Sequence, residues 1–225
     1  MNNQMLFGVA GLAAGLLAGL TLTRVGEKLS AWKCKKKNRE FKEDPRFVSL
    51  WATLLCALVN AIGWGACMYV GWQVPVPAVL ACIVLSLGIE LILMDLRLRL
   101  IPNEILLWML IVGVPMELMV NGLASIVPCI LTTMIVFGVM STLGQFMGYH
   151  KIGAGDAKLA MVMSMTLGFR AMLIGLFGMS LLLLAFCIVG MMMKKLTLKS
   201  YLPLGPFMVP GYWLGMLVLL SSAVI

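Results

Sequence analysis

The chain has 225 residues, of which 62% are hydrophobic and 12% are charged, and its formal net charge is +8. A soluble domain of ordinary composition carries about 25% charged residues, so this chain has too little polar surface to fold in water. Apolar runs of about twenty residues, without alternation of period two, exclude a β-barrel and predict membrane-spanning helices. Nine of the seventeen basic residues lie within 24–46 without a base-stacking aromatic pattern, which speaks against nucleic acid as a partner.

The sequence predicts an all-α, polytopic membrane helix bundle in a single domain that covers residues 1–225. Eight helices are expected, at about 5–23, 47–71, 76–94, 105–120, 125–144, 157–167, 171–193 and 205–225. A basic loop over 24–46 separates the first two helices. Polar segments at 95–104 and 145–156 follow the third and fifth helices.

The distribution of basic residues predicts the orientation of this bundle. If the loop 24–46 is cytoplasmic, eight spans place 16 of the 17 basic residues on the same side and leave only Arg170 opposite. This is the positive-inside pattern of membrane proteins. We therefore expect both termini outside and both polar segments at the cytoplasmic face.

Four acidic residues stand apart from the rest. Of the nine in the chain, four lie in the basic loop and Glu117 lies near the outer end of the fourth helix. The others lie at or near predicted cytoplasmic helix ends, namely Glu90, Asp95, Glu104 and Asp156. An ionisable group at membrane depth is energetically expensive, so each is a functional candidate.

Asp95 and Asp156 have distinctive surroundings. Asp95 ends a long apolar run, and Asp156 closes Gly-Ala-Gly-Asp directly before another apolar run. Both lie at helix ends on one predicted face, so their carboxyl groups can meet. Two carboxyl groups about 3 Å apart hold one proton between them, which is the arrangement that aspartyl proteolysis requires.

Other roles are compatible with the same residues. Asp156 is also suited to cap the helix that follows it, and Asp95 to pair with Arg97 or Arg99. A proton- or ion-coupled transporter would use Asp95, Asp156 and Glu90 as a relay, but such a protein predicts an internal repeat that this sequence lacks. A noncatalytic subunit of a pilus assembly system would not need both aspartates.

Three ordered motifs resemble the type IV prepilin peptidases, which are intramembrane aspartyl proteases of the GxGD type. Residues 153–159 read GAGDAKL, 95–103 read DLRLRLIPN, and 203–207 read PLGPF. The resemblance covers nearly the whole chain and implies that Asp95 and Asp156 are catalytic. It assigns substrate positioning to the other motif residues, which are Pro102, Asn103, Gly153, Gly155, Lys158, Pro203, Gly205, Pro206 and Phe207.

The resemblance also implies a substrate and a location. Family members remove a short basic leader from prepilins or pseudopilins at the cytoplasmic membrane face, just before the hydrophobic helix. The expected partners are therefore a substrate helix and the lipid bilayer. Glu90 and Glu104 are candidates to line the substrate groove.

Cofactor use is expected to differ from that of many relatives. Many family members also methylate the new N-terminus with S-adenosylmethionine, and carry two CxxC pairs in a longer loop after the first helix. The loop 24–46 contains only Cys34, and one thiol cannot build a tetrahedral zinc site. We expect no metal and no cofactor for proteolysis, and S-adenosylmethionine only if methylation is retained.

Overall fold

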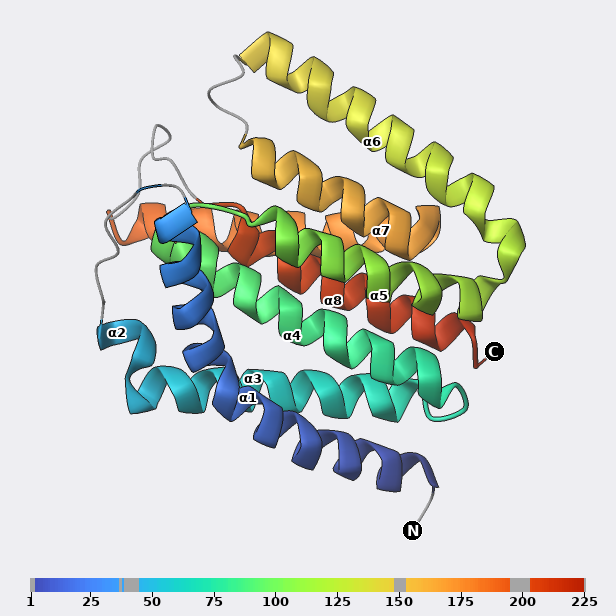
Figure 1. Cartoon of the computed structure of the whole chain (residues 1–225). Helices are drawn as coiled ribbons and strands as arrows, with labels where there is room; N and C mark the ends of the chain where they lie inside the picture. The colour runs from blue at the N-terminus through green and yellow to red at the C-terminus, as the bar shows by residue number, and fades with distance from the viewer. Residues whose placement is uncertain (1–2, 37, 39–44, 148–152, 195–202, 225) are drawn as a thin grey trace.

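The computed structural model is a helix bundle and describes residues 3–36, 38, 45–147, 153–194 and 203–224. Within these ranges the regular structure is helical throughout (Figure 1). The elements are α1 (Asn3–Lys36), α2 (Pro45–Val48), α3 (Leu50–Val70), α4 (Pro75–Leu98), α5 (Asn103–Asn121), η1 (Leu123–Ser125), α6 (Ile126–Met147), α7 (Ala154–Met192) and α8 (Gly205–Ser222). In length and composition, seven of them can cross a membrane, which confirms the predicted all-α polytopic bundle.

The helix α7 combines the sixth and seventh predicted helices. Its 39 residues are interrupted at Gly168, where φ is 67° and ψ is −176°. A positive φ suits glycine and breaks the helix, and Figure 1 shows the two halves running in opposite directions. The first half begins at Ala154, inside the Gly-Ala-Gly-Asp motif, and at 1.5 Å per residue it is about 21 Å long.

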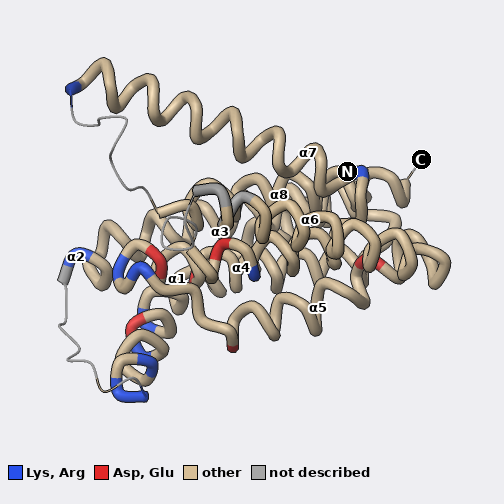
Figure 2. Tube along the Cα trace, turned by 90° about the horizontal axis from the view of Figure 1, so that it is seen from above, with Lys and Arg blue, Asp and Glu red and all other residues tan. Residues whose placement is uncertain are grey.

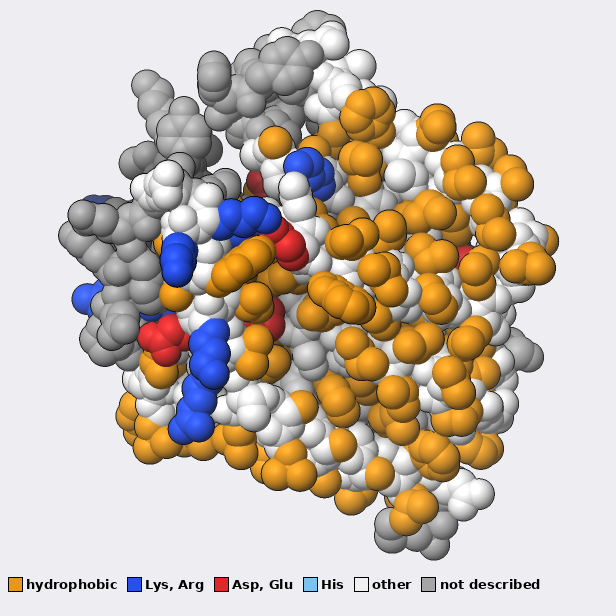
Figure 3. Space-filling model, viewed as in Figure 1, with side chains coloured by type: hydrophobic (Ala, Val, Ile, Leu, Met, Phe, Trp, Pro, Cys, Tyr) orange, Lys and Arg blue, Asp and Glu red, His pale blue; other side chains and the backbone are white. Residues whose placement is uncertain are grey.

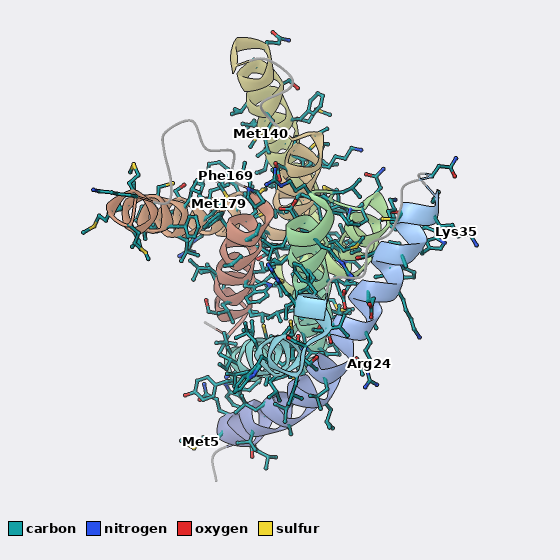
Figure 4. All side chains as sticks on the ribbon, turned by 90° about the vertical axis from the view of Figure 1, so that its left-hand side faces the viewer. Met5, Arg24, Lys35, Met140, Phe169 and Met179 are labelled. Atoms are coloured by element: carbon teal, nitrogen blue, oxygen red, sulfur yellow. The ribbon has the colours of Figure 1, made fainter. Side chains whose placement is uncertain are left out.

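The predicted boundary of the first helix is wrong, because α1 continues to Lys36 instead of ending near residue 23. Residues 24–36 of the expected loop are therefore helical, whereas 39–44 lie outside the described residues. The reason is tertiary packing: Gly26, Ser30 and Lys33 continue the buried stripe of α1 at helical spacing. Figure 4 labels Arg24 and Lys35 along this extension, at the opposite end of α1 from Met5.

Close contact between α1 and α3 depends on a second feature of the same stripe, its small residues. A β-carbon on Gly15 would lie 2.7 Å from Cβ of Trp64 and 2.9 Å from Cα of Ala61. The bare backbone instead accepts a hydrogen bond of 2.8 Å from Nδ2 of the buried Asn60. Small residues and buried amides of this kind hold membrane helices together.

The helix α4 lies at the centre of the bundle, and its C-terminal end lies at the charged end of the bundle. It packs against α1, α3, α5 and α8. It ends where Arg99 adopts a left-handed conformation, and Pro102 directly precedes α5. Figure 2 shows most charged residues of the described chain gathered at this end, opposite the two termini. The predicted polar segment 95–104 thus consists of the last turn of α4, a connection of four residues and the start of α5. Of the second predicted polar segment, 145–156, residues 148–152 lie outside the described residues.

The outer elements are α6 and the second half of α7, which expose long rows of hydrophobic side chains. Figure 3 shows hydrophobic side chains over most of one face, with most of the charged ones toward one end of it. An apolar surface of this extent is suited to lipid, not water. The side of the membrane that the charged end faces remains a prediction.

The α1–α3 contact predicts the effect of one substitution. Gly15→Leu is expected to destabilise the bundle by about 1–3 kcal/mol through overpacking, although leucine has the higher helix propensity. The measurement is the thermal unfolding midpoint in detergent. Ala14→Leu, at the exposed neighbouring position, is the control and is expected to leave the midpoint unchanged. Equal midpoints for the two variants would contradict the close approach.

Candidate active site

Asp95 lies in the last turn of α4, with 6% of its surface exposed. Its Oδ2 accepts a hydrogen bond of 3.1 Å from the backbone N–H of Gly205, the first residue of α8. This bond joins residues 110 positions apart in the chain. It fixes the carboxyl group of Asp95 between two helix ends.

Asp156 lies in the first turn of α7 and is partly buried. It lines the same cavity as Asp95. The structure therefore brings together the two aspartates that the sequence singles out. They come from the polar ends of two different helices, as expected.

Each of the two carboxyl groups packs against a glycine. A β-carbon on Gly205 would lie 2.5 Å from Oδ2 of Asp95, and one on Gly153 would lie 2.5 Å from Oδ2 of Asp156. Any side chain at either position would displace a carboxyl group. A β-carbon on a third motif glycine, Gly155, would lie 2.9 Å from Cβ of Ile101. These contacts give a physical reason for the glycines in the two motifs.

Both aspartates line a cavity of about 360 Å³ at the charged end of the bundle. Its walls come from the end of α1, the α4–α5 connection and the start of α7. The lining residues are Lys33, Asp95, Arg99, Leu100, Ile101, Asn103, Gly153, Ala154, Gly155, Asp156 and Lys158. A cavity with two carboxyl groups and three cationic side chains can hold water and a polar backbone.

Asn103 and Lys158 bridge two walls of this cavity. Lys158 Nζ donates a hydrogen bond of 3.1 Å to Oδ1 of Asn103, and so joins the first turns of α7 and α5. Both residues belong to motifs that the sequence assigns to substrate positioning. The structure places them at the edge of the cavity, beside Asp95 and Asp156.

The remaining motif residues shape the start of α8 and the turn before α5. Pro203 precedes α8, and Pro206 occupies its first turn, where a missing N–H is tolerated. The rings of Phe207 and Phe186 meet at 5.1 Å between centroids, which links α8 to the second half of α7. Pro102 is buried at the start of α5. None of these four motif residues lines the cavity that holds Asp95 and Asp156.

Lys33 is a site residue that the sequence reasoning missed. It is 9% exposed, lines the cavity and donates to both carboxylate oxygens of Glu104, at 2.7 Å and 2.5 Å. Lys36 Nζ lies 3.5 Å from the same carboxylate. Lys33 falls in the segment predicted as a loop, and its spacing from Gly26 and Ser30 was the signal that it belongs to a helix face. Glu104, expected in a groove, instead fastens α1 to α5.

Glu90 does not line the cavity with the two aspartates. It is 3% exposed, and a β-carbon on Gly26 of α1 would lie 2.6 Å from its Oε2. Neither of its oxygens accepts a hydrogen bond from the described residues. Five residues before Asp95, Glu90 faces α1 from another side of α4. Its predicted place in the substrate groove finds no support in this geometry.

The Lys33–Glu104 pair predicts a stability effect. Glu104→Gln leaves the buried ammonium group of Lys33 without its carboxylate, and we expect a loss of about 1–3 kcal/mol. Hydrogen exchange should also become faster over 27–36, because the end of α1 loses its attachment. Glu27→Gln removes a carboxylate from α1 away from the cavity and serves as the control. Unchanged exchange in Glu104→Gln would show that the pair does not hold α1.

Comparison with known proteins gives one match. A search of curated proteins found no similar sequence, and a search of solved structures found no match either. The model of the type IV leader peptidase family matches residues 78–191, just over half of the chain. The matched region runs from α4 to the second half of α7 and contains Asp95 and Asp156. The chain therefore belongs to the type IV leader peptidase family, and its general activity is that of a leader peptidase.

Proposed function

We propose that Asp95 and Asp156 are the catalytic pair of an aspartyl peptidase. Its substrates are type IV prepilins or pseudopilins, whose short basic leader it removes at the cytoplasmic face of the bacterial inner membrane. The observation that carries the proposal is that both carboxyl groups line one polar cavity at the charged end of a membrane bundle. The family match supports the leader as the part that is removed.

The reaction follows from two carboxyl groups that share one proton. The ionised member takes a proton from a water molecule between the two groups, and the water oxygen attacks the scissile carbonyl carbon. The protonated member donates its proton to the carbonyl oxygen, which gives a neutral tetrahedral intermediate. When this intermediate collapses, the carboxyl group that took the water proton gives it to the leaving amine and the C–N bond breaks, while the other carboxylate takes a proton from a hydroxyl group of the intermediate as the new carbonyl forms. The pair is then left with one shared proton, as at the start.

The surroundings of the pair support this assignment. The N–H of Gly205 holds one carboxyl group in place, and the absence of a side chain at Gly153 makes room for the other. A catalytic group held in place in this way does not need to reorganise during the reaction. The proposal concerns proteolysis, in which no step uses a metal or S-adenosylmethionine.

Two isosteric substitutions test the proposal. Asp95→Asn and Asp156→Asn each replace a carboxyl group with an amide, which cannot take up or donate the shared proton. We expect each variant to lower leader removal to below about 1% of the wild-type rate. The measurement is the gel shift of a type IV prepilin co-expressed with each variant, at matched membrane levels of the enzyme. Glu27→Gln is the control for loss of one carboxylate and should cut normally. Normal cutting by either aspartate variant would remove that residue from the mechanism.

The packing of Asp95 against Gly205 leads to a further prediction. Gly205→Ala pushes a methyl group into the carboxyl group of Asp95, so leader removal should fall at least about tenfold, because catalysis is sensitive to displacements of about 1 Å. Gly138→Ala is the matched control, since a β-carbon there meets nothing within 4 Å. The measurement is kcat/KM on the same prepilin, with the unfolding midpoint of each variant. Equal rates for the two alanine variants would contradict the close contact between Gly205 and Asp95.

A further inference from the structure

An apolar groove opens beside the catalytic cavity, between α5 and the first half of α7. Its volume is about 350 Å³. Its apolar walls are Leu106, Leu107 and Leu110 from α5, and Met161, Val162 and Met165 from α7. Among the described residues, α6 contributes a single lining residue, Thr133.

The groove exists because α6 packs against α7 and not along α5. Figure 1 shows the first half of α7 between α6 and α5, with α6 at the outside of the bundle. The side of α5 next to the groove is consequently open, and Leu107 is 56% exposed. In a membrane, an open apolar groove is filled either by lipid or by an apolar helix.

The groove adjoins the catalytic cavity. Asn103 and Lys158 line both spaces, and their hydrogen bond of 3.1 Å lies at the boundary between them. From Lys158 to Met165 the groove follows about two turns of α7, or about 10 Å at 1.5 Å per residue. A chain that leaves the two aspartates in this direction moves from polar walls directly into apolar ones.

We propose that this groove binds the first turns of the substrate's apolar helix, directly after the scissile bond. The inference rests on the proposed function, in which the peptide is cut where its polar leader meets that helix. The groove joins the catalytic cavity through shared lining residues and is apolar along its walls. The polarity of the two spaces changes where that of the substrate does. The groove also adjoins the cavity that holds Asp95 and Asp156, which favours the peptide that they cut over a lipid as its occupant.

The groove would determine which peptide bond of the substrate lies at the aspartates more than how tightly the substrate binds. Lipid tails are as apolar as leucine, so a helix gains little hydrophobic free energy when it leaves lipid for the groove. What it gains is packing contact, which fixes the bond that lies between Asp95 and Asp156. Met161 and Met165 are flexible side chains that can adapt to different substrate helices.

A bulkier side chain in the wall of the groove tests this inference, because it would exclude the substrate helix. Leu107→Trp adds bulk to the wall, and Leu58→Trp, at a 54% exposed position of α3, is the matched control. Each variant is assayed on a full-length prepilin and on a short peptide that ends a few residues after the cleavage site. We expect Leu107→Trp to lower kcat/KM about tenfold or more on the full-length substrate, mainly through KM, and less than twofold on the short peptide. Leu58→Trp should change neither.

Photo-crosslinking provides a second readout that does not depend on turnover. A benzophenone amino acid is placed at residue 107 or 58 in the inactive Asp95→Asn background, together with full-length prepilin. We expect a prepilin adduct from position 107, mapped to the start of its apolar helix, and none from position 58. Adducts with lipid alone at position 107 would overturn the inference.

The outcomes separate this inference from the proposed function. Wild-type cutting by Asp95→Asn or Asp156→Asn would defeat the catalytic assignment, and the adduct at position 107 would still report on the groove. Inactive aspartate variants, combined with a Leu107→Trp enzyme that behaves like Leu58→Trp on both substrates, would defeat only the groove. An equal loss on both substrates would also count against the groove, because the short peptide does not enter it.

Discussion

Close approach at glycine is the physical constraint on which this bundle depends. In lipid there is little hydrophobic force between helices, so packing contact and hydrogen bonds must hold them together. Gly15 brings α1 onto α3, and Gly175 and Gly211 bring the second half of α7 onto α8 so closely that a β-carbon on either would meet the partner's backbone. Gly153 and Gly205 apply the same constraint to the two aspartates. The two carboxyl groups are therefore positioned by the same kind of close contact at glycine that packs the helices together.

The cavity depends equally on where helices end. Asp95 and Asp156 lie at the last turn of α4 and the first turn of α7, where the chain leaves the apolar layer and polar side chains can reach water. The extension of α1 supplies a third wall through Lys33, which Glu104 holds in place. The first helix thus takes part in the site, although the family match begins only at residue 78.

The bundle combines a tightly packed centre with an open flank. The centre is α4 and its neighbours, which place the aspartates through buried contacts such as the Gly205–Asp95 hydrogen bond. The flank is α5 and the first half of α7, where the exposed Leu107 and its apolar neighbours border the groove proposed for the substrate helix. In the proposed function, a carboxyl pair held in place by the packing lies beside an adaptable apolar groove.

The sequence alone determined the fold class, the order of the helices and the pair of aspartates. These follow from short-range properties: apolar run length decides that the helices span a membrane, and a carboxyl group at membrane depth is too expensive to be incidental. The break between 167 and 171 was also predicted, because eight spans place 16 of the 17 basic residues on one side and leave only Arg170 opposite, at this turn. Only the tertiary structure decided that 24–36 is helical, that Glu104 fastens α1, and that Glu90 faces Gly26, away from the cavity. Each of these depends on which face of one helix meets another distant in the chain, and that choice is made by packing across the whole bundle, not by local sequence.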